Sequence, residues 1–225
     1  MLPLGIFLGL LPGFAWLVFY LSEDRHPEPR KAIALTFING AGFAFFALAA
    51  QVILDQIFKS QNIEHFGLVA ILVFAFIEEV LKFLAAYAAI HKNPAFDEPI
   101  DAMIYSVVAA LGFATVENIG IVAGSNAGAS PFLAGILYVI TFRFVGATLL
   151  HTLTSSIIGY QWAKGIRVFR QKPYVFWGII LATVIHAVFN LIILNFGETG
   201  FPVIFLVIVA IFVLRDFERL KQRFV

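Results

Sequence analysis

The amino-acid sequence predicts an all-α membrane protein, a polytopic bundle of about seven transmembrane helices, from three observations. Of its 225 residues, 61% are hydrophobic and 13% are charged, whereas a soluble domain carries about 25% charged residues. The mean hydropathy is +0.93. The apolar residues come in runs of about 20, enough to cross a hydrocarbon core of about 30 Å, without the strict alternation of a membrane barrel. We therefore expect a single transmembrane domain over residues 1–225.

Hydropathy places the spans in order along the chain, separated by short polar segments. Their approximate bounds are 2–21, 31–54, 67–90, 100–123, 131–160, 174–196 and 201–215. Residues 1–21 lack the basic region that opens a signal peptide, so we interpret them as a retained first span. The fifth span is long enough to tilt in the bilayer.

Loop charge supports this number of spans and orients them. The segments after spans one, three, five and seven hold twelve basic residues, whereas those after spans two, four and six hold Lys59 alone. Basic residues accumulate in cytoplasmic loops. The distribution predicts an N-terminus outside, a C-terminus in the cytoplasm, and a multi-pass location in the cell membrane, which we expect to be a bacterial cytoplasmic membrane.

Polar groups interrupt the apolar runs of the third to sixth spans. These groups are Glu78, Glu79, Lys82, Glu117, His151, His186 and Asn190. A charge at bilayer depth costs at least about 2.5 kcal/mol, so such residues persist where they face a partner or a water-filled cavity. The cluster is the first candidate for the function, and it places the catalytic helices at approximately 67–196.

The third span carries the densest part of the cluster. Lys82 follows Glu78 by four residues and Glu79 by three, so it can pair with either carboxylate along a helix. Adjacent residues point about 100° apart, so one carboxylate can reach a cavity while Lys82 holds the other. A glutamate in a cavity suits a general base, whereas a buried ion pair that locks helix packing is the structural alternative.

The sixth span places His186 and Asn190 on one helix face, about 6 Å apart. This spacing is typical of an oxyanion hole or a substrate clamp. His151 lies in the fifth span. Taken alone, either histidine is more often an interhelical hydrogen-bonding residue than a catalyst.

The fourth span supplies further acids. Glu117 and Asn118 follow a run of small residues that permits close helix packing. Glu117 is a second cavity acid or a structural acceptor, and the sequence leaves both interpretations open. Asp101 begins this span, where a carboxylate favours the positive end of a helix. We assign these residues, with Lys82, to support.

Several classes of function are excluded by missing motifs. The chain has no cysteine, no His-Glu-x-x-His sequence or its inverse, no Gly-x-Ser-x-Gly sequence and no phosphate-binding glycine-rich loop with lysine. No basic patch interleaved with aromatic residues indicates nucleic acid as a partner. Glutamate and histidine chemistry remains, with or without a metal.

At these residues the chain resembles the PrsW family of intramembrane proteases, which is related to the CAAX prenyl endopeptidases and the bacterial Abi proteins. The matching segments are FIEEVLKF at 76–83, FDEPID at 96–101, LGFATVEN at 111–118, His151 with Gly159, and HAVFN at 186–190. The resemblance covers nearly the whole chain. It implies hydrolysis of a peptide bond in a membrane-anchored protein, a substrate class that includes anti-sigma factors and so points to regulated proteolysis.

The residues and the resemblance together suggest a mechanism. Glu78 or Glu79, aided by His151, activates water, while His186 and Asn190 stabilise the oxyanion. The sequence gives little basis for deciding which of the two glutamates is the general base. We expect Glu79 as base and Glu78 as its support. We expect no metal, with zinc at His151, His186 and Glu79 as the alternative, because two histidines and a glutamate form known open zinc sites.

Two other functions use the same polar residues. A proton-coupled transporter or channel would relay protons through the buried acids and histidines, although the chain lacks the internal repeat of many transporter folds. A non-catalytic membrane scaffold or immunity-type protein would keep the fold without turnover. The expected partners are a membrane-anchored protein substrate and the lipid bilayer, and the sequence does not indicate an oligomeric state.

Overall fold

The computed structural model describes residues 2–22, 26–65, 67–124, 141, 144–197 and 200–221, and every regular element in them is a helix. The elements are α1 Leu2–Leu21, α2 Arg30–Ser60, α3 Leu68–Ile90, α4 Asp101–Gly124, the π-helical turn η1 Phe144–Thr148, α6 Leu149–Arg167, α7 Gln171–Phe196 and α8 Gly200–Lys221. The predicted all-α class is therefore confirmed.

The seven α-helices of the described residues correspond to the seven predicted spans. Several run further than hydropathy predicted: α2 continues to Ser60 and α8 to Lys221. The reason is that backbone hydrogen bonding, not apolarity, decides where a helix ends. The fifth predicted span begins outside the described residues, and its described part continues through α6 to Arg167. The exact number of spans stays a prediction.

The surface of the bundle suits a hydrocarbon environment. Helices α2, α4, α7 and α8 contain stretches long and apolar enough to cross a membrane. Large apolar side chains lie exposed along them, such as Phe46 on α2, Trp177 on α7 and Phe212 on α8. Contiguous exposed apolar surface of this extent is rare on proteins surrounded by water. The fold is that of a membrane helix bundle.

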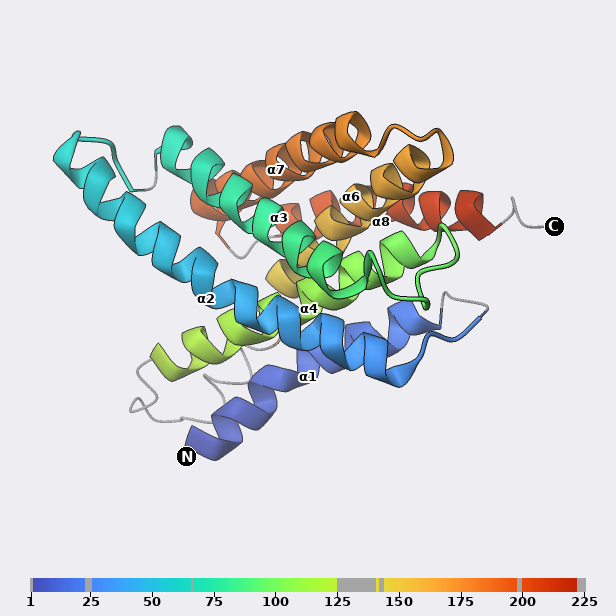
Figure 1. Ribbon diagram of the computed structural model, residues 1–225. Helices are drawn as coiled ribbons and strands as arrows, with labels where there is room; N and C mark the ends of the chain where they lie inside the picture. Colours follow the sequence, from blue (N-terminus) through green and yellow to red (C-terminus); the bar gives the residue numbers. More distant parts are fainter. Residues whose placement is uncertain are drawn as a thin grey trace.

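The connections alternate between the two ends of the bundle (Figure 1). The described residues that join α1 to α2, α3 to α4 and α6 to α7 lie at one end, where α8 also finishes. The connection from α2 to α3 lies at the other end. This alternation gathers the basic segments at one end, as the charge distribution requires. That this end is cytoplasmic stays a prediction.

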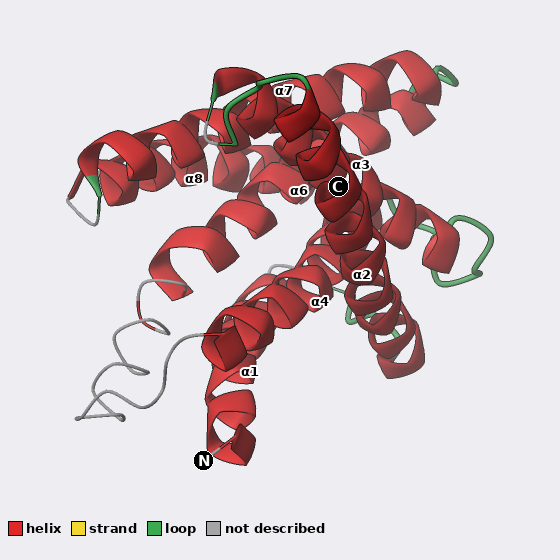
Figure 2. Ribbon diagram, turned by 90° about the vertical axis from the view of Figure 1, so that its left-hand side faces the viewer, coloured by secondary structure: helices red, strands yellow, loops and turns green. Residues whose placement is uncertain are grey.

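Helices α4 and α6 form the interior. Helix α4 contacts α1, α2, α3 and α6, and it is buried along most of its length. Helix α6 in turn packs between α4 and the pair α7 and α8 (Figure 2). The polar residues of α6 therefore lie against α3, α4 and α7 instead of lipid.

Glycine permits the closest of these helix crossings. A Cβ atom at Gly40 of α2 would lie 2.0 Å from the backbone oxygen of Ala109, and one at Gly112 of α4 would lie 2.0 Å from that of Phe37. A Cβ atom at Gly159 of α6 would lie 2.5 Å from the backbone oxygen of Ala102. Small residues let membrane helices approach in this way. The close packing predicted for the small-residue run of α4 is confirmed.

Candidate active site

The middle of α3 carries three charged side chains at the centre of the bundle. Glu79 and Lys82 are fully buried, whereas the Glu78 side chain keeps 12% of its surface exposed. The difference follows from helix geometry, because adjacent residues point about 100° apart. Glu79 faces the interior with Lys82, and Glu78 faces a cavity.

The Lys82 ammonium is held by three partners. It donates to Glu79 Oε1 at 2.7 Å, to His151 Nδ1 at 3.1 Å and to Thr154 Oγ1 at 3.2 Å. These partners occupy all three of its N–H donors. A buried cation is tolerated when it is paired and hydrogen-bonded in this way. Lys82 therefore joins α3 to α6.

Glu79 joins α3 to α7. Its Oε1 atom accepts from Lys82 at 2.7 Å and from His186 Nδ1 at 2.7 Å. Its Oε2 atom is buried and has no hydrogen-bond partner among the described residues. A carboxylate held by a lysine and a histidine inside the protein is well placed to orient them.

Glu78 has a different set of neighbours. Its Oε1 atom accepts from Gln51 Nε2 of α2 at 2.7 Å, and its Oε2 atom lies 3.7 Å from His186 Nε2. His186 Nδ1 donates to Glu79, so in a neutral His186 the other nitrogen, Nε2, carries a lone pair that faces Glu78. Glu78 Oε2 and His186 Nε2 are then both acceptors, and the space between them suits a proton, a water molecule or a cation.

His151 uses both of its ring nitrogens. Nδ1 accepts from Lys82, which leaves the proton on Nε2, and Nε2 lies 2.8 Å from Glu117 Oε2. Its ring lies edge-on to that of His186, with centroids 5.3 Å apart. The two histidines therefore adjoin each other while contacting different carboxylates.

The turn before His151 is held at several points. Asn118 of α4 donates to the Thr148 hydroxyl at 3.1 Å, and Trp16 of α1 donates to the Phe144 carbonyl at 2.9 Å. Thr148 and Phe144 lie in the π-helical turn η1, and π-helical turns are often found at functional sites. Asn118 thus links α4 to the turn from which α6 continues.

Two cavities border α2 at the site, one between α2, α3 and α7 and the other between α2 and α4. One of about 570 Å³ is lined by Glu78 and Asn190, and the other, of about 620 Å³, is lined by Glu117. Leu48 and Gln51 line both cavities. The two acids that keep some exposed surface thus face openings large enough for a peptide segment.

The structure gathers most of the residues that the sequence singled out. Glu78, Glu79, Lys82, Glu117, His151 and His186 form one connected cluster. Asn190 lines the same cavity as Glu78.

Asp101 lies apart from this cluster. It begins α4, sixteen residues or about 24 Å along the helix from Glu117. Its carboxylate accepts from the backbone N–H groups of Asp97 at 2.9 Å and Glu98 at 2.7 Å. These bonds tie the start of α4 to the segment before it, far from the cluster. The supporting role assigned to Asp101 from the sequence stays a prediction.

Sequence reasoning missed two residues that contact the cluster. Gln51 lies in an apolar run of α2, and Thr154 is three residues after His151. A lone amide within a membrane span was the available signal for Gln51, since buried polar groups in lipid need a partner. Thr154 carried no comparable signal, because its hydroxyl also bonds the backbone of its own helix.

Comparison with known proteins identifies the family. Residues 28–215 match the PrsW-protease family, described as a PrsW family intramembrane metalloprotease. The chain belongs to the PrsW family. The expected class of enzyme, the intramembrane proteases, is thereby confirmed, as is a multi-pass location in the cell membrane.

Curated relatives agree with this assignment. A protein named Protease PrsW from Geobacillus kaustophilus is 28% identical over 197 residues, covering 86% of this chain and 81% of its own. Proteins of the same name from Bacillus subtilis and Clostridioides difficile are 27% and 26% identical. These two matches cover 82% and 91% of this chain, and 80% and 84% of the relatives. No solved structure matches the chain.

The PrsW family description names a metal, and residues of this chain fit one. Glu78, His151 and His186 each offer a ligand atom within 4.8 Å of the others. Two histidines and one glutamate form a ligand set of open catalytic zinc sites. The contact from His186 to Glu79 is the type of second-shell contact that orients a metal-bound histidine. The zinc alternative predicted from the sequence used Glu79, whereas this trio contains Glu78. To bind a metal, His151 would have to give up its contact with Lys82 or with Glu117.

Proposed function

We propose that this PrsW protein hydrolyses a peptide bond of a membrane-anchored protein at the Glu78 carboxylate. The observation that carries this proposal is the contrast in the settings of the two adjacent glutamates. Glu78 faces a cavity, and Glu79 is buried between Lys82 and His186. One carboxylate is accessible to water and substrate, while the other fixes the groups around it.

Glu78 is the better candidate for the general base, in place of the expected Glu79. A base has to reach the water molecule whose proton it removes. Glu79 is fully enclosed, and its Oε1 atom already accepts two hydrogen bonds. Glu78 accepts one hydrogen bond, from Gln51, and its other oxygen borders the gap to His186.

The proposed reaction proceeds in two steps. Glu78 takes a proton from a water molecule in the cavity as the water oxygen bonds to the carbonyl carbon of the scissile peptide. The resulting tetrahedral intermediate then collapses, the C–N bond breaks, and the proton on Glu78 passes to the leaving amine nitrogen. The carboxylate is regenerated, so the cycle consumes only water and the peptide bond.

His186 and Asn190 are placed to stabilise the oxyanion of this intermediate. They lie one turn apart on α7, and Asn190 lines the cavity that contains Glu78. An amide N–H of Asn190 and a protonated His186 Nε2 can both donate to that oxygen. His151, held by Lys82 and Glu117, closes the far side of the site. If a metal were held by Glu78, His151 and His186, it would supply Lewis-acid polarisation of the carbonyl and of the attacking water, and Glu78 would then be a ligand instead of the base.

The class of substrate follows from the position of the site. The cluster lies deep in a bundle whose outer surface is apolar, and its two cavities border α2. A substrate reaches such a site when a membrane span or a juxtamembrane segment presents it. We therefore propose a membrane-anchored client, the class that includes anti-sigma factors.

The test compares cells that produce the wild-type protein, Glu78→Gln or Glu64→Gln. Glu64 is an exposed glutamate between α2 and α3, so its variant controls for the loss of a carboxylate. Sequencing of new N-termini in the membrane fraction should show a cleaved client with the wild-type and Glu64→Gln proteins alone. The purified protein in liposomes should then cleave that client.

Unchanged cleavage by the Glu78→Gln or His186→Ala protein, correctly inserted, would overturn the proposed mechanism. Cleavage that is absent from all three strains and from the liposomes would overturn the proposed function itself. Dialysis against a chelator, followed by addition of zinc, would show whether the reaction depends on a metal.

A further inference from the structure

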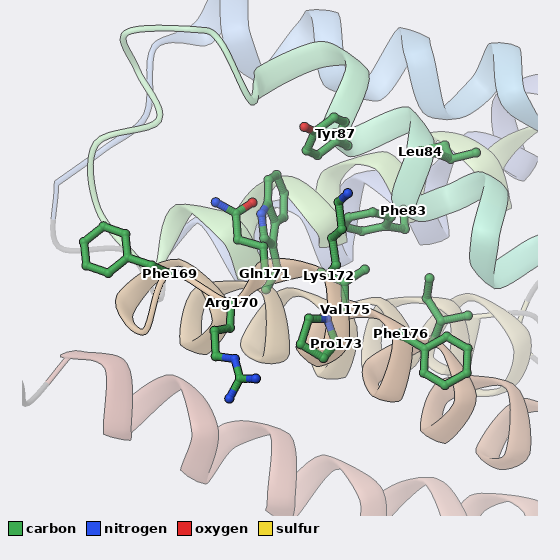
Figure 3. A pocket seen from close by; sticks show the side chains of 12 residues that line it. Phe83, Leu84, Tyr87, Phe169, Arg170, Gln171, Lys172, Pro173, Val175 and Phe176 are labelled. Atoms are coloured by element: carbon green, nitrogen blue, oxygen red, sulfur yellow. The ribbon is translucent and has the colours of Figure 1, made fainter.

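A groove of about 870 Å³ lies between α3, α6 and the start of α7, outside the catalytic cluster (Figure 3). Its inner wall is aromatic: the Trp162 ring packs edge-on against that of Phe83, with centroids 5.4 Å apart, and lies tilted against that of Tyr87, with centroids 5.7 Å apart. Phe96 also stacks on Trp162, with ring centroids 4.8 Å apart. Ring packing on several neighbours therefore holds Trp162 in place in this wall.

The polar rim of the groove has one sign of charge. Arg170, Gln171 and Lys172 line it, and none of its twelve lining residues is acidic. Lys172 extends toward Phe83 and the α3 side of the groove, whereas the Arg170 guanidinium points away, to the other side of α7 (Figure 3). Lys172 is thus the cation inside the groove, and Arg170 adds positive charge at its edge. The matching ligand is an anion.

The remaining surface of the groove opens toward lipid. Leu84 of α3 is 42% exposed and Phe176 of α7 is 55% exposed. Both belong to apolar stretches that continue toward the middle of the bundle. Phe169, at the edge of the groove, is 96% exposed and adds a large apolar side chain to this surface.

We propose that this groove binds an anionic phospholipid. The phosphate lies beside Lys172, with the Gln171 amide and the Tyr87 hydroxyl as further hydrogen-bonding groups, and an acyl chain follows Leu84 and Phe176 into the membrane. Basic pockets between membrane helices bind anionic headgroups by the same chemistry. An acidic peptide would share the charge match but leave the apolar wall of the groove without a partner.

A tryptophan of the chain can serve as an intrinsic fluorescence probe for this lipid. It has three tryptophans, Trp16, Trp162 and Trp177, and Trp162 lines the groove. In a Trp16→Phe/Trp177→Phe protein, fluorescence reports on Trp162 alone. Bromine atoms on an acyl chain quench tryptophan fluorescence over short distances, so a chain in the groove can quench Trp162 although its ring is buried. We would place this protein in phosphatidylcholine vesicles and add brominated-chain phosphatidylglycerol or, in parallel, brominated-chain phosphatidylcholine.

The expected result is saturable quenching by brominated phosphatidylglycerol at a fraction where brominated phosphatidylcholine quenches little. Lys172→Gln should weaken the apparent affinity about five-fold, the factor expected for one basic residue at an anionic surface. Lys31→Gln is the matched control, because Lys31 is exposed near the start of α2 and lies outside the groove. It should behave as the parent protein.

Equal quenching by the two brominated lipids, or equal loss in the Lys172→Gln and Lys31→Gln proteins, would overturn the proposal. So would displacement of quenching by an acidic peptide but not by unlabelled phosphatidylglycerol. If the double tryptophan variant does not fold, Trp162→Phe in the otherwise natural chain gives the same test, because the lipid-selective part of the quenching should disappear. Neither form depends on proteolysis, so the outcome is independent of the proposed function.

Discussion

Two neighbouring segments of α3 are built in contrasting ways. The segment Glu78–Lys82 meets its surroundings through directional polar contacts to α2, α6 and α7. The segment Phe83–Tyr87, which follows directly, meets them through aromatic rings and borders an open groove. Directional contacts fix atoms where a reaction needs them, whereas ring packing supports a surface that accepts ligands of variable shape.

Glu78→Gln should have the largest effect. We expect a loss of about 10²–10⁴-fold in the cleavage rate, the usual contribution of a general base. The amide is isosteric, and Glu78 keeps some exposed surface, so the protein should remain folded. The measurement is kcat with the identified client, at matched protein levels in liposomes.

Glu79→Gln separates the roles of the two glutamates. Because Glu79 is tied to Lys82 and His186, its variant should lose stability as well as rate. If Glu79→Gln abolished cleavage while Glu78→Gln left it intact, the base would be Glu79 and our assignment would be reversed.

Lys82→Met comes next in size. It leaves the Glu79 carboxylate buried without its cation, a change that costs about 3–5 kcal/mol in the free energy of unfolding. Unfolding in mixed micelles, followed by circular dichroism, would measure the loss. Lys92→Met, at an exposed lysine beyond α3, should stay within about 0.5 kcal/mol of the wild type.

The Glu79→Gln/Lys82→Met double variant tests the cause of that loss. With the charge of Glu79 removed as well, more than half of the stability lost in Lys82→Met should return. A double variant no more stable than Lys82→Met would show that packing, not an unpaired charge, explains the effect.

Gln51→Leu should have a smaller effect. It removes the hydrogen bond to Glu78 Oε1 but leaves the carboxylate beside its cavity, so we expect a cost of about 1 kcal/mol. Expressed in kcat/KM, that is roughly a five-fold loss. Gln51→Glu, which adds a like charge beside Glu78, should be worse than Gln51→Leu; equal rates would argue against a direct contact between the two side chains.

Phe83→Leu should be the mildest change. It removes one edge-on contact to Trp162, a contribution of about 1 kcal/mol to the free energy of unfolding. The same unfolding assay as for Lys82→Met measures it. If Phe83→Leu lowered the free energy of unfolding as much as Lys82→Met does, the segments Glu78–Lys82 and Phe83–Tyr87 would not differ in how strongly their contacts stabilise the protein.

The sequence predicted the helices and the members of the polar cluster well, because hydropathy and charge report directly on burial in lipid. It did not predict which partner each side chain meets. Helical spacing allowed Lys82 to pair with Glu78 or Glu79, and only the positions of α6 and α7 decide for Glu79. Gln51 was missed for the same reason, since its partner lies 27 residues away on another helix.

The groove beside Trp162 illustrates another limit of sequence reasoning. Its residues come from three helices and from the connection between α6 and α7, and they have no common motif, so they share a surface only once the helices have packed. Nothing in the sequence around Trp162 and Lys172 predicts that these two residues line the same groove. Cavities are properties of packing, whereas periodicity describes one element at a time.

The π-helical turn Phe144–Thr148 bears on how this chain tolerates insertions and deletions. A π-helical turn holds one residue more than an α-helical turn, so it changes by about 100° the direction that Phe144, at its start, faces relative to α6. Deleting Val145 would restore α-helical winding and rotate Phe144 away from Trp16 without shifting His151 along α6. Ancestral or designed chains that lack this extra residue would need a different α1 surface to present the same histidine.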